Sequence, residues 1–178
     1  KISWFFPISE EIIPSIKSKS LRTFLRRIDQ LLEEAQIKVI EKELDEAEYT
    51  TWLPYYKEHM LEQGYELIAN PEWFDAKKAQ GKKISAVFLE KDKLLIGSLI
   101  YTSSQKKACS IAFRANNRED FFPGGRSSIG AVLDFLFLKR MKEEGMTEVS
   151  AGKSRNAFGV INSIGNLDYK LRFGYLPE

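Results

Sequence analysis

The stretch Ile84-Ser-Ala-Val-Phe-Leu-Glu90 is the first of three β-rich runs, and it is followed by Leu94-Leu-Ile-Gly-Ser-Leu-Ile-Tyr-Thr102 and Ala108-Cys-Ser-Ile-Ala-Phe-Arg114. The polar breaks between the runs, residues 91–93 and 103–107, have the length of hairpin connections. Strands joined by such short breaks pair antiparallel with each other. The three runs therefore predict a β-meander.

The segments on both sides of the meander alternate between helical and strand patterns, judged by apolar spacing and by β-branched content. In chain order we expect a helix at 20–35, a strand at 37–42, helices at 45–63 and 71–79, then, after the meander, a helix at 129–144, a strand at 147–151 and a helix at 167–173. Pro54 either opens the second helix or kinks it. We expect the helix at 129–144 to connect the strands on either side of it in a right-handed crossover, which makes these two strands parallel. The predicted fold class is α/β, with a mixed sheet.

Size and composition exclude several classes of protein. The chain has 178 residues, of which 43% are hydrophobic and 29% charged, as is typical of one globular core. Its apolar runs are far shorter than the ~20 residues of a membrane-spanning helix, and its net charge of +2 does not by itself indicate nucleic-acid binding. With one cysteine, Cys109, and no Cys/His cluster at ligand spacing, we expect a cytoplasmic protein without a metal.

A glycine-containing turn, Phe122-Pro-Gly-Gly-Arg-Ser-Ser-Ile-Gly-Ala131, lies between the meander and the longest predicted helix. A helix N-terminus offers unpaired N–H groups and the positive end of the helix dipole, so this turn suits a pyrophosphate or a carboxylate. Ser127 and Ser128 either contact such a ligand or cap the helix. A plain chain reversal at Gly124 and Gly125, without a ligand, explains the same residues equally well.

The order of elements, this turn and the ending Tyr169-Lys-Leu-Arg-Phe-Gly174 together resemble the GNAT superfamily of N-acyltransferases. Within it they resemble the Fem-type branch of peptidoglycan aminoacyltransferases and related domains, which typically carries a Phe/Tyr-Lys-x-x-Phe-Gly ending. The segment 53–74 is similar to the substrate-covering helices of that branch. The resemblance divides the chain into an N-terminal strand and helix extension, residues 1–36, and a GNAT-like acyltransferase domain, residues 37–178.

The resemblance implies a sheet that opens between two central strands, where an acyl donor such as acetyl-CoA or another acyl-CoA enters. GNAT enzymes hold the donor pyrophosphate with Arg/Gln-x-x-Gly-x-Gly/Ala at the start of the long helix. In this chain Arg126 and Ala131 match that motif, whereas Ile129 stands where a glycine is expected and Gly130 is one position away. The implied donor site comprises Gly124, Gly125, Arg126, Ser127, Ser128, Gly130 and Ala131.

The same resemblance places Lys170 where many GNAT enzymes have a tyrosine that protonates the leaving thiolate. A lysine at this position can stabilise negative charge on the tetrahedral intermediate, and Tyr169 or Tyr175 can supply a proton. The competing interpretation makes Tyr169 a core contact and Lys170 a surface residue. Glu90, at the end of a predicted strand, is a candidate base for the amine. His59, the only histidine, is interpreted as a surface or half-buried helix residue.

The predicted function is N-acyl transfer from acyl-CoA to an amine. One alternative is tRNA-dependent aminoacyl transfer, as in Fem-type enzymes, which is favoured by the incomplete pyrophosphate motif and by the basic residues Arg22, Arg26 and Arg27. The other alternative is a non-catalytic binding module on the same fold. The oligomeric state does not follow from the sequence. Because the chain stops at residues 176–178, before the hairpin strands that complete many GNAT sheets, we expect another segment to supply them.

Overall fold

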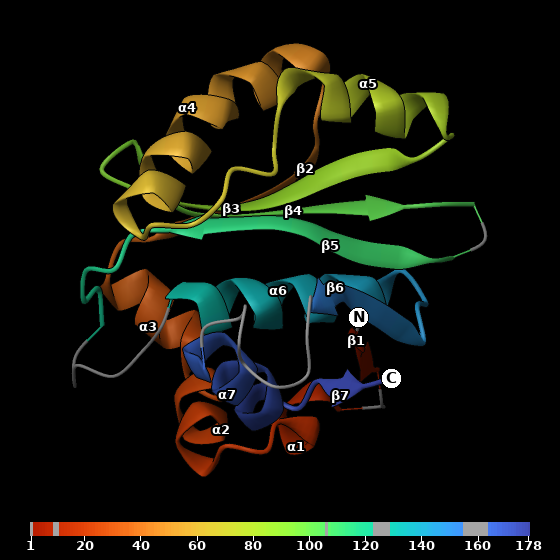
Figure 1. Ribbon diagram of the computed structural model, residues 1–178. Helices are drawn as coiled ribbons and strands as arrows, with labels where there is room; N and C mark the ends of the chain where they lie inside the picture. The colour runs from red at the N-terminus through yellow and green to blue at the C-terminus, as the bar shows by residue number, and fades with distance from the viewer. Residues whose placement is uncertain (1, 9–10, 106, 123–128, 155–163) are drawn as a thin grey trace.

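The computed structural model describes residues 2–8, 11–105, 107–122, 129–154 and 164–178. Within these residues a seven-stranded sheet in the order β2-β3-β4-β5-β6-β1-β7 carries helices on both faces (Figure 1). The strands β5 and β6 are parallel to each other, and the other neighbouring pairs are antiparallel. The predicted α/β class with a mixed sheet is confirmed.

The elements have the following bounds. The strands are β1 (Ile2–Pro7), β2 (Lys38–Glu43), β3 (Lys83–Lys91), β4 (Leu94–Ser103), β5 (Cys109–Asn116), β6 (Glu148–Ser154) and β7 (Leu176–Pro177). The helices are α1 (Ile12–Ser15), α2 (Lys19–Leu25), α3 (Ile28–Glu34), α4 (Glu46–Glu62), α5 (Pro71–Ala79), α6 (Ile129–Glu143) and α7 (Ile164–Phe173).

The predicted meander is confirmed as β3, β4 and β5. The turn between β3 and β4 consists of Asp92 and Lys93, both with positive φ, at 51° and 64°. Two consecutive residues in this conformation make the type of turn whose twist matches that of the flanking strands. The long helix α6 then connects β5 to the parallel strand β6, as predicted.

One sequence prediction about the helices was wrong, and one of the two alternatives for Pro54 is excluded. The single helix expected at 20–35 is two helices, α2 and α3, which break at Arg26 and Arg27. The break lets α2 bury Leu25 while α3 buries a separate apolar stripe. Pro54 does not open α4 but lies inside it, because Asp45 begins the helix with a capping box.

The N-terminal segment lies within the same sheet as the rest of the chain. The strand β1 pairs with β6 on one side and with β7 on the other, and all of these pairings are antiparallel. Trp4 and Phe6 of β1 are buried in the same core as α6 and α7. The N-terminal and C-terminal strands therefore form one edge of the sheet together.

Two hydrophobic cores lie on opposite faces of the sheet. One is formed by α4, α5 and the adjacent face of β3–β5, with Tyr49, Trp52 and Phe113 among its rings. The other lies between the sheet and α6 and also contains residues from α2, α3 and β1. Because α6 has core helices around it, its residues from Ala131 to Leu138 are all buried. Figure 1 shows α4 and α5 above the sheet and α6 below it.

We predict that Gly174→Ala destabilises the fold more than Gly64→Ala. Both glycines have positive φ, at 117° and 67°, but a Cβ at Gly174 would lie 2.6 Å from the carbonyl oxygen of Ser15, whereas nothing lies within 4 Å of a Cβ at Gly64. The backbone penalty of about 1 kcal/mol applies to both variants, and Gly174→Ala adds a clash with backbone, for a total of roughly 2–4 kcal/mol. Urea unfolding measures both free energies, and equal losses would contradict this packing.

Candidate active site

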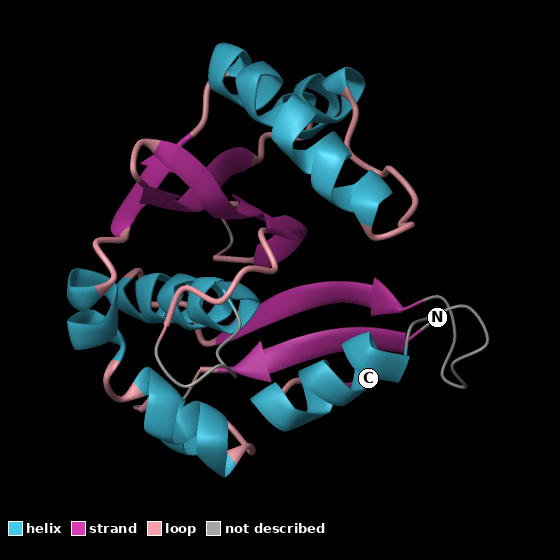
Figure 2. Cartoon of the chain, turned by 90° about the vertical axis from the view of Figure 1, so that its left-hand side faces the viewer, coloured by secondary structure: helices cyan, strands magenta, loops and turns pink. Residues whose placement is uncertain are grey.

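The strands β5 and β6 separate soon after they meet. They are paired at two positions, Cys109 with Val149 and Ser110 with Ser150. Beyond these pairs β5 continues to Asn116 and β6 continues to the end of its own range, without a described pairing between them. Figure 2 shows β1 and β6 turned away from the other strands. This is the central opening that the GNAT resemblance implied.

Lys170 is buried beside this opening. Its side chain extends from α7, is 6% exposed, and places Nζ 3.5 Å from the carbonyl oxygen of Ala151, the first residue of β6 beyond the paired positions. The same ammonium lies 5.3 Å from the centre of the Trp4 ring, within the range of a cation–π contact. Lys170 is therefore not the surface residue of the competing interpretation.

The surroundings of Lys170 make its ammonium unusually acidic. Burial, together with the nearby positive charge of Arg114, lowers the pKa of Lys170 to about 8, although the charge of Asp134 opposes this shift. A lysine with such a pKa can both donate and accept a proton near neutral pH.

A buried carboxylate connects α6, β5 and the C-terminal residues. Asp134 is fully buried and accepts hydrogen bonds from Nε of Arg114 at 2.6 Å, from the Tyr169 hydroxyl at 2.8 Å and from the Tyr175 hydroxyl at 3.0 Å. A second nitrogen of Arg114, Nη2, donates to the Tyr175 hydroxyl at 3.4 Å. Arg114 lies on the part of β5 that is no longer paired with β6.

This cluster shifts the acidity of its members. Burial, followed by the Asp134 charge, raises the pKa of both Tyr169 and Tyr175 well above the usual value. Burial alone would lower the pKa of Arg114, but the attraction of Asp134 outweighs it and the net shift is upward. A tyrosine with a raised pKa is a weak proton donor. Tyr169 is therefore better suited to holding α7 in position than to acid catalysis.

The other predicted residues fall in different places. Gly124, Gly125, Arg126, Ser127 and Ser128 lie outside the described residues. Gly130 and Ala131 belong to the first turn of α6, where Gly130 is half-buried and Ala131 is fully buried. Glu90 lies on β3, and β4 and β5 lie between that strand and β6, so the structure does not bring Glu90 together with Lys170.

His59 is a half-buried helix residue, as its sequence interpretation expected, but its hydrogen-bond partner Asn117 was not predicted. The histidine lies on α4, with Nδ1 donating to the carbonyl oxygen of Tyr55 at 2.8 Å and Nε2 lying 2.7 Å from Oδ1 of Asn117. The Tyr55 hydroxyl donates to the same Oδ1 at 3.0 Å, and the two rings lie 4.1 Å apart between centroids. Sequence spacing pairs Tyr55 with His59 on one helix face, but it carries no signal that Asn117 joins them.

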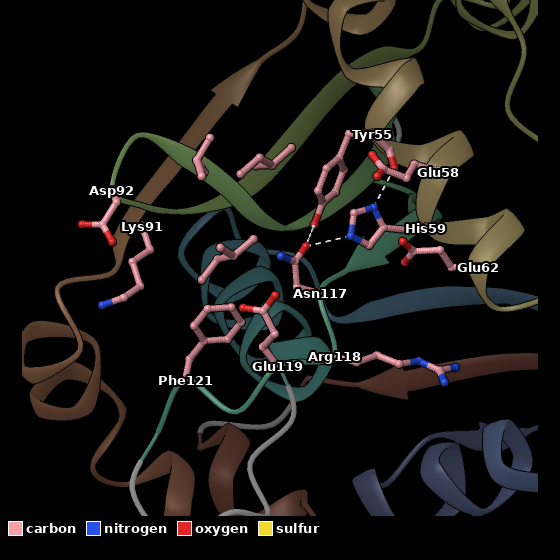
Figure 3. A pocket seen from close by; sticks show the side chains of 13 residues that line it. Tyr55, Glu58, His59, Glu62, Lys91, Asp92, Asn117, Arg118, Glu119 and Phe121 are labelled. Carbon is pink, nitrogen blue, oxygen red and sulfur yellow. Dashed lines mark hydrogen bonds between the residues drawn. The ribbon is translucent and has the colours of Figure 1, made fainter.

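Tyr55, His59 and Asn117 form part of the wall of a cavity of about 730 Å³ (Figure 3). This cavity lies between the C-terminal half of α4, the β3–β4 turn and the residues that follow β5. Its volume is in the range of small-molecule sites. Within the described ranges, no group of three or more His, Cys, Asp or Glu residues is arranged to hold a metal ion, and no described helix combines the length and apolarity needed to cross a membrane.

A sheet opened between two parallel strands, with a long helix joining them and a meander before it, is the GNAT-type acyltransferase fold. Comparison with solved structures confirms the predicted fold. The sequence itself matches no protein-family model, and a search of curated proteins gives no match.

Three solved structures illustrate the likeness. FemX superposes with a TM-score of 0.70 at 12% identity, covering 99% of this chain and 59% of the FemX chain. The C-terminal domain of a putative lysylphosphatidylglycerol synthetase from Agrobacterium fabrum gives 0.62 at 12% identity, covering 99% and 58%. L-PGS from Bacillus licheniformis gives 0.59 at 13% identity, covering 98% and 59%. The chain thus spans less than two thirds of each of these proteins, and at such identities the likeness establishes the fold.

We predict that the contribution of Lys170 to stability depends on pH between about 8 and 10.5. Its pKa falls from 10.5 to about 8 on folding, so in this window the unfolded chain holds a proton that the folded chain lacks, and stability rises with pH. Below pH 8 both states are protonated and the full cost of the buried charge is present. Relative to Lys170→Met, the wild-type free energy of unfolding should rise by about 2–3 kcal/mol from pH 7 to pH 10.

Urea unfolding of both proteins at the two pH values measures this difference. Lys139→Met, which removes an exposed lysine of α6, is the matched control and should give no such rise. A wild-type minus Lys170→Met difference that stays constant with pH would mean that Lys170 is not buried as described.

Proposed function

We propose that this chain is an N-acyltransferase domain that moves an acyl group from acyl-CoA to an amine. The observation that carries the proposal is a buried lysine with a lowered pKa, Lys170, at the point where β5 and β6 separate. Two further features support the same class of chemistry. They are the ending at 169–174, which resembles that of Fem-type enzymes, and the likeness of the fold to FemX. We expect the carbonyl of the acyl donor to lie between the separated strands. The phosphates of the donor would bind the segment from Gly124 to Gly130, which includes Arg126.

The proposed reaction uses few protein groups. The amine nitrogen attacks the thioester carbonyl carbon, a C–N bond forms, and the C–S bond then breaks with its electron pair leaving on sulfur. The nitrogen loses one proton, and the thiolate gains one. As an ammonium, Lys170 stabilises the negative charge that develops on the carbonyl oxygen or on the thiolate, and with a pKa of about 8 it can also transfer its proton to sulfur.

Tyr169 takes a lesser part in the proposal. It anchors α7 to Asp134 next to Lys170, so it fixes the position of the lysine. Glu90 is left out of the proposal, because β4 and β5 lie between its strand and the opening beside Lys170. Proximity and orientation of two bound substrates supply most of what acyl transfer needs, so a site with one strong catalytic group is sufficient.

Transfer of an aminoacyl group from aminoacyl-tRNA is the second candidate. It is favoured by the likeness to FemX and by the incomplete pyrophosphate motif, in which Ile129 replaces a glycine. Ile129 is buried and a Cβ at Gly97 would lie 2.5 Å from its Cγ2, so this side chain packs against β4. A non-catalytic module on the same fold is the third candidate.

Thermal unfolding with acetyl-CoA, free CoA and charged tRNA distinguishes these candidates. A ligand at about 100 times its dissociation constant stabilises a folded protein by roughly 2.7 kcal/mol. We expect a higher melting temperature with both CoA species, and the loss of this increase in Arg126→Ala but not in Lys170→Met. An increase with tRNA alone, falling steeply with salt, would favour aminoacyl transfer. No increase with any of the three would favour the non-catalytic module.

A further inference from the structure

The cavity beside His59 has two chemically different sides. Its base is apolar and consists of Leu95, Ile96 and Phe121, and the exposed Leu94 lines its edge. The carboxylates of Glu58 and Glu62 extend from α4, Glu119 follows β5, and Asp92 belongs to the β3–β4 turn (Figure 3). The cavity therefore offers alkyl contacts below and negative charge around its rim.

The rim carries excess negative charge. Four carboxylates, those of Glu58, Glu62, Asp92 and Glu119, outnumber two cations, Lys91 and Arg118, so the lining has a net charge of −2. The ammonium of Lys91 also donates a hydrogen bond to the carbonyl oxygen of Ala35 at the end of α3, so it points away from the rim. The whole chain has a net charge of +2, so the cavity is a local exception to the charge of the molecule.

The negative charge of the rim disfavours the anionic acyl donor and favours a cationic amine. The phosphates of a CoA or tRNA donor would be repelled by the rim, whereas an alkylamine is a cation at neutral pH. The residues from Asn117 to Phe121 continue directly from β5, whose preceding residues form one side of the opening beside Lys170. An occupant of the cavity would thus lie against the residues that directly follow this strand.

We propose that this cavity is the acceptor site and that it selects a primary alkylamine whose chain carries a second positive charge. The apolar base holds the methylene chain and the rim carboxylates hold the ammonium. Tyr55 and Asn117, joined by hydrogen bonds to each other and to His59, keep this wall of the cavity in one arrangement. The role as acceptor rests on the proposed transferase function, whereas the preference for a cationic amine does not.

The imidazole of His59 allows a direct test, because the chain contains no other histidine. The ring Cε1–H signal in a ¹H–¹³C NMR spectrum reports on the cavity wall without competing signals. We expect 1,5-diaminopentane to shift this signal saturably, and the neutral 1,5-pentanediol, which has the same chain length, to leave it unchanged. No donor is added, so failure of the transferase proposal does not affect this result.

Matched variants test the rim itself. Glu58→Gln/Glu62→Gln should weaken diamine binding about three- to tenfold, since each exposed ion pair contributes modestly. Glu143→Gln/Glu148→Gln, which makes the same charge change on α6 and β6 away from the cavity, should bind as the wild type does. Equal shifts with diamine and diol, no shift with either, or equal weakening in both double variants would each overturn the proposal.

Discussion

The arrangement of the candidate site depends on one buried carboxylate. Asp134 lies on α6 and is completely shielded from water, and its two oxygens accept hydrogen bonds from β5, from α7 and from the residue that follows Gly174. A buried charge that loses its partners costs several kcal/mol, so these three elements must stay together for the fold to be stable. Lys170 follows Tyr169 directly, and the hydrogen bond from Tyr169 to Asp134 therefore also fixes where the lysine ammonium lies.

The separation of charge across the molecule is consistent with a reaction between an anionic donor and a cationic acceptor. The buried Lys170 and the half-buried Arg114 lie at the opening between β5 and β6, whereas the exposed carboxylates of Glu58, Glu62 and Glu119 surround the cavity at the end of β5. Electrostatic attraction of this kind would direct each substrate to its own side of one strand. The strand β5 forms one side of the opening, and the residues that directly follow it line the cavity.

Local sequence patterns predicted those elements whose partners are close in the chain. The meander was predictable because residues 91–93 and 103–107 are too short to form anything except hairpin connections. The position of β1 beside β6 was not predictable, because nothing local relates residues 2–7 to residues 148–154. In the sequence Asp134 is a polar interruption of an apolar run, and its partners lie 20 residues before it and 41 residues after it. Lys170 was found through the family-like ending around it, whereas His59 was passed over because Asn117 is 58 residues away.

Product formation tests the central claim of acyl transfer most directly. Purified protein is incubated with 1,5-diaminopentane and either acetyl-CoA or alanyl-tRNA, and mass spectrometry measures the acylated diamine over time. The account predicts an acylated product from at least one donor, formed about 100-fold or more slowly by Lys170→Met, as expected for the loss of a proton-transferring or charge-stabilising group. An equal rate for Lys170→Met, or the absence of acylated product from both donors with the wild-type protein, would contradict it.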